Sequence, residues 1–178
     1  MTKRAVIFGG GNIGRGFIGQ LFCESGYEVV FVDVDEELMA ALNRDRKYRL
    51  EAVSNAGVEN VEIGPVRAVS SRDVEAVAAA VAEADIGATA VGANALKFIV
   101  PNLAAGLARR AAAGAVPINF IICENLHGAA AHVRRVQDRV ARRLRQAVQP
   151  LARQIDKRLG VVGRGEQYVV ELHVDACG

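Results

Sequence analysis

The sequence predicts an α/β fold built around a mostly parallel sheet, and two observations carry this prediction. Short apolar runs alternate with helical patterns repeatedly along the 178 residues, which is typical of a parallel sheet joined by right-handed crossovers. The first apolar run, residues 5–8, ends at three consecutive glycines, as a buried strand of such a sheet often does. The pattern therefore favours a doubly wound sheet with helices on both faces.

Each element follows from a local pattern. Strands are assigned to β-branched or apolar runs that polar residues or glycine terminate, and helices to segments whose apolar residues recur every three or four positions. One stretch changes to short alternating pieces around a Ser-Asn-Ala-Gly turn, which predicts an inserted β-hairpin. In chain order, the expected elements are strand 5–8, helix 13–26, strand 28–34, helix 36–46, hairpin strands 48–53 and 58–63, strand 66–69, helix 70–84, strand 86–91, helix 95–113, strand 118–122, helix 127–159 and strand 168–174.

Three residues refine these boundaries. Gly26 is expected to end the first helix, because glycine adopts the left-handed conformation common at helix C-termini. Ser71 is expected to cap the helix over residues 70–84. Pro101 predicts a kink, or a break between two helices, within residues 95–113.

Composition and charge argue against several classes of protein. The net charge is +2 and aromatic residues make up 5% of the chain, which disfavours a polybasic protein or a base-stacking nucleic-acid module. No apolar run reaches the roughly 18–20 residues of a membrane span. The three cysteines, Cys23, Cys123 and Cys177, form no CxxC pair, which fits a reducing compartment. We therefore expect a cytoplasmic protein without a nucleic-acid or membrane partner.

The loop after the first strand fits the pattern G-x-G-x-x-G, with Gly9, Gly11 and Gly14 in its three positions. In a dinucleotide-binding (Rossmann) unit, the first glycine permits the tight turn, the second lets the backbone approach a pyrophosphate, and the third lets helix and strand pack closely. The helix N-terminus then presents free N–H groups to the phosphates. The pattern alone is weak, but its place between a predicted strand and a predicted helix is what the motif requires. The alternative is a glycine-rich turn that binds another ligand or none.

Asp33 closes the second predicted strand, 19 residues after Gly14, near the spacing of about 20 expected of a ribose-binding acid. A carboxylate there can accept both ribose hydroxyls and repels a 2′-phosphate. Asp35 and Glu36 add to the negative field, and no arginine is adjacent to Asp33 in the sequence. We therefore predict NAD rather than NADP as the cofactor.

A longer segment carries a resemblance to a known family. Residues 8–19, FGGGNIGRGFIG, closely resemble the opening of the mannitol-1-phosphate 5-dehydrogenases, which belong to the polyol-specific long-chain dehydrogenases. The segment 89–92 is similar to the family's turn beside the cofactor, and Cys123-Glu124-Asn125 resembles its Cys-Glu-Asn element. Together the matches span residues 5 to about 135.

The resemblance implies a reversible, metal-free oxidation of D-mannitol 1-phosphate to D-fructose 6-phosphate by NAD. In this family a lysine of a mostly helical C-terminal domain, within a Lys…Asn…His element, is the general base, and asparagines stabilise the oxyanion. Asn125 inherits one of these asparagine roles. After Pro150 the sequence departs from the family, since Lys157 has no Asn and His at the family's spacing. We therefore divide the chain into an NAD-binding domain, residues 1–150, and an extension, residues 151–178, and expect the chain alone to be inactive.

The predicted site residues follow from the motif and the resemblance. Arg15 could instead pair with an acid, Glu124 could be a solvated or helix-dipole partner, and Asn125 could cap a helix. Two other functions stay open: a non-catalytic dinucleotide-binding module, and a related mannitol 2-dehydrogenase or hexuronate reductase. Asn125 is the expected catalytic residue, and the expected cofactor-binding residues are Phe8, Gly9, Gly10, Gly11, Asn12, Ile13, Gly14, Arg15, Asp33, Ala90, Val91, Gly92, Glu124 and Asn125.

Overall fold

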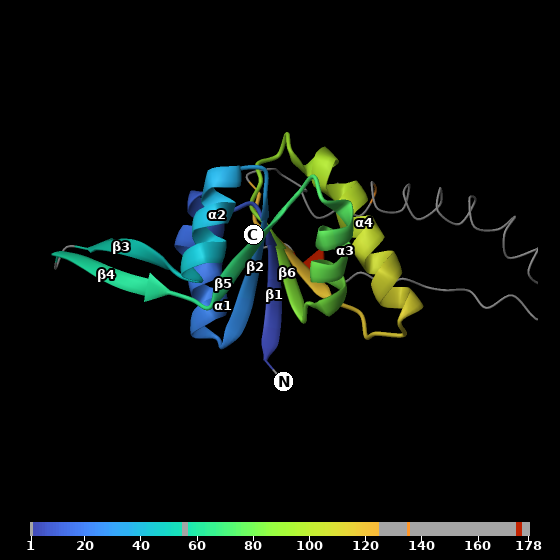
Figure 1. Cartoon of the computed structure of the whole chain (residues 1–178), viewed down its shortest axis with the longest axis horizontal. Helices are drawn as coiled ribbons and strands as arrows, with labels where there is room; N and C mark the ends of the chain where they lie inside the picture. The colour runs from blue at the N-terminus through green and yellow to red at the C-terminus, as the bar shows by residue number, and fades with distance from the viewer. Residues whose placement is uncertain (1, 55–56, 125–134, 136–173, 176–178) are drawn as a thin grey trace, which may run out of the picture.

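The structure is a computed structural model that describes residues 2–54, 57–124, 135, 174 and 175. Helices lie on both sides of a central sheet, and a hairpin of two strands projects away from it (Figure 1). The elements are β1 (Lys3–Phe8), the π-helical turn η1 (Gly14–Gly19), α1 (Gln20–Glu24), β2 (Tyr27–Asp33), α2 (Glu36–Asp45), β3 (Tyr48–Ser54), β4 (Gly57–Ile63), β5 (Val66–Ser70), α3 (Val74–Glu83), β6 (Ile86–Thr89), α4 (Leu96–Ala112), β7 (Asn119–Ile122) and β8 (Val174–Asp175).

The central sheet has the strand order β5-β2-β1-β6-β7-β8, and all its pairs are parallel. The chain runs from β1 outwards to β5, returns to pair β6 with β1, and continues outwards to β8. The order therefore reverses between β1 and β6, so the loops that follow these two strands leave the sheet in opposite directions. This switch point at the carboxyl edge is where open α/β sheets bind their ligands.

The strand β1 is buried on both faces, which explains its continuous apolar run. Ala5, Val6, Ile7 and Phe8 are all 0% exposed, and successive side chains of a strand point to opposite faces. Val6 and Phe8 belong to a core that includes residues of α3 and α4, whereas Ala5 and Ile7 belong to a core that includes residues of α1 and α2. The same strand thus anchors both helical layers.

The predicted doubly wound sheet and inserted hairpin are confirmed, with small differences at the ends of elements. β3 and β4 pair antiparallel throughout their length. Pro101 lies inside one continuous helix, α4, so the chain has no break there. The expected helix 127–159 lies outside the described residues apart from residue 135, and so does the expected strand 168–174 apart from Val174, the first residue of β8.

The first helix differs from the prediction in form and in the face that it buries. Its first part is π-helical, and only its later part is α-helical. Ile18 and Phe22 are buried, whereas Ile13, Phe17 and Leu21 are 56%, 60% and 45% exposed. Gly14 and Gly19 face the core, where a Cβ on either would overlap backbone or side-chain atoms, so the helix packs closely on this side.

The start of α3 corrects a second expectation, because Ser71 is not its N-cap. Asp73 is the N-cap, and its carboxylate accepts a hydrogen bond from the N–H of Ala76 at 3.0 Å. Ser71 still belongs to the turn after β5, since its N–H donates to the carbonyl oxygen of Asp33 at 2.8 Å. The helix therefore begins at Val74 rather than at residue 70.

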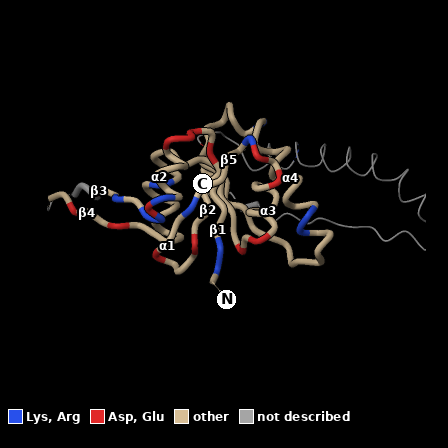
Figure 2. The backbone as a smooth tube through the Cα atoms, in the orientation of Figure 1, with Lys and Arg blue, Asp and Glu red and all other residues tan. Residues whose placement is uncertain are grey.

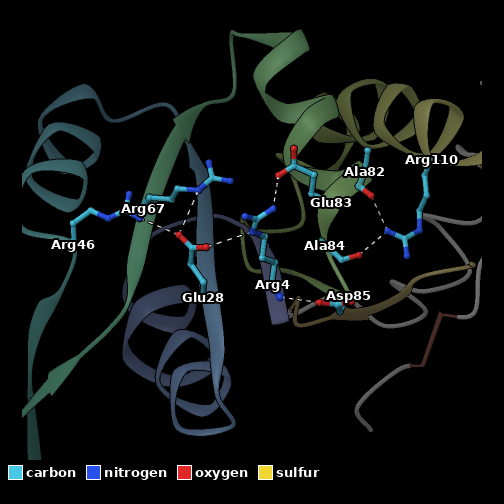
Figure 3. A network of polar contacts seen from close by, with 9 residues as sticks. All are labelled: Arg4, Glu28, Arg46, Arg67, Ala82, Glu83, Ala84, Asp85 and Arg110. Atoms are coloured by element: carbon cyan, nitrogen blue, oxygen red, sulfur yellow. Dashed lines mark hydrogen bonds and ion pairs between the residues drawn. The ribbon is translucent and has the colours of Figure 1, made fainter. Parts of the chain in front are cut away.

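A network of charged side chains closes the amino edge of the sheet (Figure 3). Glu28, at the start of β2, has a side chain only 15% exposed, and its carboxylate lies 2.9 Å from Arg46, 3.4 Å from Arg4 and 3.8 Å from Arg67. Arg4 continues the network to Glu83 at 2.8 Å. These ion pairs lie at the edge opposite to the switch point and leave the carboxyl edge to the loops.

Basic and acidic residues are interspersed along the described backbone (Figure 2), and the start of α2 is acidic. Asp35 caps this helix, and Glu36 and Glu37 lie in its first turn. Carboxylates at a helix N-terminus are stabilised by the helix dipole. No helix within the described ranges combines the length and the apolar character needed to cross a bilayer.

Candidate functional site

The candidate site lies at the carboxyl edge, where the loops that follow the paired strands β1 and β6 diverge. Gly9, at the first position of the loop after β1, has φ +100°, a conformation that favours glycine. A Cβ built on Gly9 would overlap the carbonyl oxygen of Ala90, and one on Gly14 would overlap that of Gly9. These two positions therefore require glycine so that the loop can pack between β6 and the first turn of the helix.

Gly11 has a different reason to be glycine. A Cβ at Gly11 would meet no atom within 4 Å, so nothing in the described protein fills the space beside it. Gly11 is exposed at the start of the helix, where backbone N–H groups lack intrahelical partners. The loop therefore offers an anion open space and free donors, which is the division of roles that the glycine pattern predicts.

The Asp33 carboxylate ties the end of β2 to the glycine loop. Its Oδ2 accepts a hydrogen bond from the N–H of Gly10 at 2.6 Å, and its Oδ1 accepts from Val34 at 2.7 Å and from Asp35 at 3.0 Å. A carboxylate has about four acceptor positions, two on each oxygen, so Oδ1 is filled and Oδ2 keeps one. Asp33 thus shapes the loop, and Oδ2 keeps an acceptor position for a further donor; its predicted contact with the ribose hydroxyls stays a prediction.

Arg15 forms no ion pair within the described residues, so the alternative of a pair with an acid is not what the structure shows, and its contact with a phosphate stays a prediction. Its Nε donates to the carbonyl oxygen of Gly10 at 2.5 Å, so the side chain folds back onto the loop. The hydroxyl of Tyr48, on the hairpin, donates to the carbonyl oxygen of Arg15 at 2.5 Å. Burial raises the pKa of Tyr48 well above its usual value, so the phenol stays a donor. Sequence patterns gave no signal for Tyr48, because this contact crosses from the inserted hairpin to the loop.

The Glu124 carboxylate holds the turn after β6. Its Oε1 accepts from the N–H of Val91 at 3.0 Å and its Oε2 from the N–H of Gly92 at 2.7 Å. The backbone beside it continues the pairing of β6 with β7, since the N–H of Cys123 donates to the carbonyl oxygen of Thr89 at 2.9 Å. Both carboxylate oxygens of Glu124 thus accept hydrogen bonds from the backbone of the turn, and we call this pair of hydrogen bonds the Glu124 clamp.

The other predicted residues take different positions. Phe8 is buried in the core and leads into the loop, while Asn12 and Ile13 are exposed on the first helical turn. Ala90 is half-buried, and its N–H donates to the carbonyl oxygen of Phe8 at 2.7 Å. Asn125, the expected catalytic residue, lies outside the described residues.

The surroundings of Cys23 are those of a small packing residue rather than of a nucleophile. It is half-buried against Pro65, and burial raises the pKa of its thiol to about 11. A thiol with such a pKa is protonated at neutral pH and reacts poorly. Within the described ranges, no three His, Cys, Asp or Glu residues are gathered as a set of metal ligands.

We expect Glu124→Gln to loosen the turn after β6. Glutamine keeps the size of the side chain but replaces one acceptor oxygen by an NH₂ group, which faces a backbone N–H and cannot accept from it. A loss of about 1–2 kcal/mol corresponds to roughly tenfold faster amide exchange, and we expect it by NMR hydrogen exchange at whichever of Val91 and Gly92 faces the NH₂ group. The matched control is Glu62→Gln, because Glu62 forms an exposed ion pair with Lys47 on the hairpin. Unchanged exchange at both amides in Glu124→Gln would contradict the clamp.

Comparisons with known proteins identify the family and the relatives of this chain. The family model described as the mannitol dehydrogenase Rossmann domain matches residues 3–160. The chain is 45% identical over 150 residues to a protein of Brevibacillus brevis named mannitol-1-phosphate 5-dehydrogenase, a match that covers 84% of this chain and 38% of that protein. It is 46% identical over 131 residues to a protein of Bacillus licheniformis with the same name, covering 73% of this chain and 34% of that protein. The chain thus spans little more than a third of the length of these curated relatives.

Solved structures share the fold at low sequence identity. A Pseudomonas fluorescens mannitol 2-dehydrogenase, in a ternary complex with NAD and D-mannitol, matches with a TM-score of 0.62 at 16% identity, over 84% of this chain and 40% of that one. A D-sorbitol dehydrogenase in substrate-free form matches with a TM-score of 0.64 at 14% identity, over 98% of this chain and 49% of that one. Both likenesses show that the chain has the Rossmann-type fold.

Proposed function

This chain belongs to the mannitol dehydrogenase family, and from that membership we propose that it forms the NAD-binding part of a polyol-phosphate dehydrogenase. The reaction is the interconversion of D-mannitol 1-phosphate and NAD with D-fructose 6-phosphate and NADH. The observation that carries this proposal is the 45% identity over 150 residues with a mannitol-1-phosphate 5-dehydrogenase. The open space at Gly11 and the remaining acceptor position on Asp33 support NAD as the cofactor.

Each part of the described site has a task in this proposal. The backbone at Gly11 and the helix that follows would hold the pyrophosphate, and Oδ2 of Asp33 would accept a ribose hydroxyl. Glu124 would keep the turn of Val91 and Gly92 in place beside the cofactor. When bound, NAD supplies the acceptor for the hydride that leaves the alcohol carbon. Asn125, next to Glu124 in the chain, would stabilise the developing oxyanion, a role that rests on the family resemblance.

Titration calorimetry of the 178-residue chain with NAD and NADH tests the binding part of the proposal. We expect both dinucleotides to bind, because the loop, the helix N-terminus and Asp33 all lie in this chain. We also expect no oxidation of D-mannitol 1-phosphate by this chain alone, since it carries no Lys, Asn and His at the family's spacing. A folded sample, checked by circular dichroism, that binds neither dinucleotide would overturn the proposal.

The reaction itself is tested on a longer version of the chain that adds a C-terminal catalytic domain of the family, by following NADH oxidation with three substrates. We expect D-fructose 6-phosphate to be reduced faster than D-fructose or a hexuronate. Reduction of D-fructose or the hexuronate alone would instead indicate the related mannitol 2-dehydrogenase or hexuronate reductase reaction. Dinucleotide binding without turnover of any of the three would indicate a binding module.

A further inference from the structure

The carboxyl end of β5 brings an arginine beside the ribose-binding acid, although the two are far apart in the sequence. Asp33 is the register partner of Ser70 across β2 and β5. The pairing continues one residue further, because the N–H of Ser71 donates to the carbonyl oxygen of Asp33 at 2.8 Å. Arg72 follows directly, and its own N–H donates to Oγ of Ser70 at 3.3 Å. The turn that carries Arg72 is therefore fastened to the end of β2.

The Arg72 guanidinium is held by Glu36, the first residue of α2. Nη1 of Arg72 lies 3.1 Å from Oε1 of Glu36, and the two side chains are 71% and 77% exposed. Glu36 comes three residues after Asp33, so the ion pair spans the two turns that flank the ribose-binding carboxylate. An ion pair this exposed is worth about 0–1 kcal/mol, so another anion can take the guanidinium from Glu36.

A 2′-phosphate has the chemistry to do so. Arginine binds phosphate through two parallel hydrogen bonds, which a single carboxylate oxygen does not match. A phosphate on the ribose 2′-oxygen would extend from the sugar that Asp33 binds, towards the turns that carry Glu36 and Arg72. The carboxylates of Asp33 and Glu36 repel it, whereas Arg72 attracts it. Discrimination between NAD and NADP is thus a balance between these groups rather than a consequence of Asp33 alone.

We propose that the Arg72 guanidinium can bind the 2′-phosphate of NADP, and that its ion pair with Glu36 competes with this binding. Glu36 is then a specificity-determining residue that favours NAD. This inference rests on the proposed function, because it needs a dinucleotide seated on the glycine loop with its ribose at Asp33. The sequence prediction considered only arginines adjacent to Asp33 in the chain, and the sheet supplies one from the neighbouring strand.

The test compares Glu36→Gln with the double variant Glu36→Gln/Arg72→Ala in the 178-residue chain, with NAD and NADP titrated by calorimetry. Glu36→Gln keeps the side-chain shape, removes one repelling charge and releases Arg72. We expect NADP to bind about tenfold more tightly, since the lost ion pair and the lost repulsion together approach 1.4 kcal/mol, while the Kd of NAD changes less than twofold. In the double variant Glu36→Gln/Arg72→Ala we expect this gain to disappear.

The control is Glu37→Gln, which removes the same charge one residue further along the same helical turn. An equal gain in NADP affinity in Glu37→Gln, or a gain in Glu36→Gln that persists in the double variant with Arg72→Ala, would overturn the proposal. Either result would mean that removing any negative charge near the site improves NADP binding. Unchanged NADP affinity in Glu36→Gln, with NAD bound normally, would overturn it as well. A folded chain that binds neither dinucleotide would overturn the proposed function and this inference with it.

Discussion

A Gly14→Ala chain is expected to lose dinucleotide binding together with about 3 kcal/mol or more of its free energy of unfolding. The added Cβ would overlap the carbonyl oxygen of Gly9 and lie 3.0 Å from its carbonyl carbon. Both are backbone atoms of a turn that is itself packed against Ala90, so no flexible side chain can give way. Overpacking at a rigid site typically costs 1–3 kcal/mol and can cost more. Urea unfolding and an NADH fluorescence titration measure the two effects.

Gly11→Ala is the matched control, because the same methyl group is added three residues earlier in the same loop. A Cβ there meets nothing within 4 Å, so we expect the free energy of unfolding to stay within about 0.5 kcal/mol of the unmodified chain. We nevertheless expect NADH binding to fall at least tenfold, because the methyl group enters the space kept for the pyrophosphate. A Gly11→Ala chain that binds NADH normally would show that the phosphates bind elsewhere.

Arg110→Met is expected to give the largest loss of stability away from the loop, about 3 kcal/mol. Arg110 is only 7% exposed, and its guanidinium donates to the carbonyl oxygens of Ala82 at 3.0 Å and Ala84 at 2.6 Å (Figure 3). It also donates to the carbonyl oxygen of Val116 at 2.6 Å. Methionine fills much of the same volume but donates nothing. Three carbonyl groups then lose a charged donor, and a buried acceptor left unpaired, here that of Ala84, costs about 1–3 kcal/mol.

Arg109→Met supplies the comparison for this variant. Arg109 is the preceding residue of α4, but its side chain is 48% exposed and pairs with the exposed Glu75. An exposed ion pair contributes about 0–1 kcal/mol, so urea unfolding should separate the two methionine variants by at least 2 kcal/mol. Equal free energies of unfolding for both would mean that Arg110 does not join α4 to the end of α3.

The fold was predictable because its signals are local. The apolar run of β1, the glycine loop and the Ser-Asn-Ala-Gly turn of the hairpin can each be recognised within about ten residues, and each maps onto the observed element. The N-cap of α3 was predicted two residues too early. Ser71 and Asp73 are both good capping residues, and the choice depends on a hydrogen bond from Ser71 to β2 that local sequence does not encode.

The site was predictable in its backbone and less so in its side chains. Glycine roles depend on the turn that the glycines form, which the motif specifies. Asp33, Glu124 and Arg15 were predicted as site residues, and the partners that the structure shows for them are backbone groups that the fold brings together. The clamp of Glu124 on Val91, for example, joins residues 33 positions apart. Arg110 belongs to no sequence motif. An arginine near the end of a helix is expected to be solvent-exposed, and only the structure shows that Arg110 is buried.

The two edges of the sheet also differ in what a substitution there changes. β1 is six residues long, so the Glu28 network and the glycine loop lie about 20 Å apart. Free-energy changes at sites separated by more than about 10 Å usually add independently. A tighter ion-pair network at the amino edge can therefore offset the stability lost to a substitution in the loop, without altering the loop itself. In such a domain, substitutions in the loop that change the cofactor preference are tolerated as long as interactions at the amino edge keep the free energy of unfolding high enough.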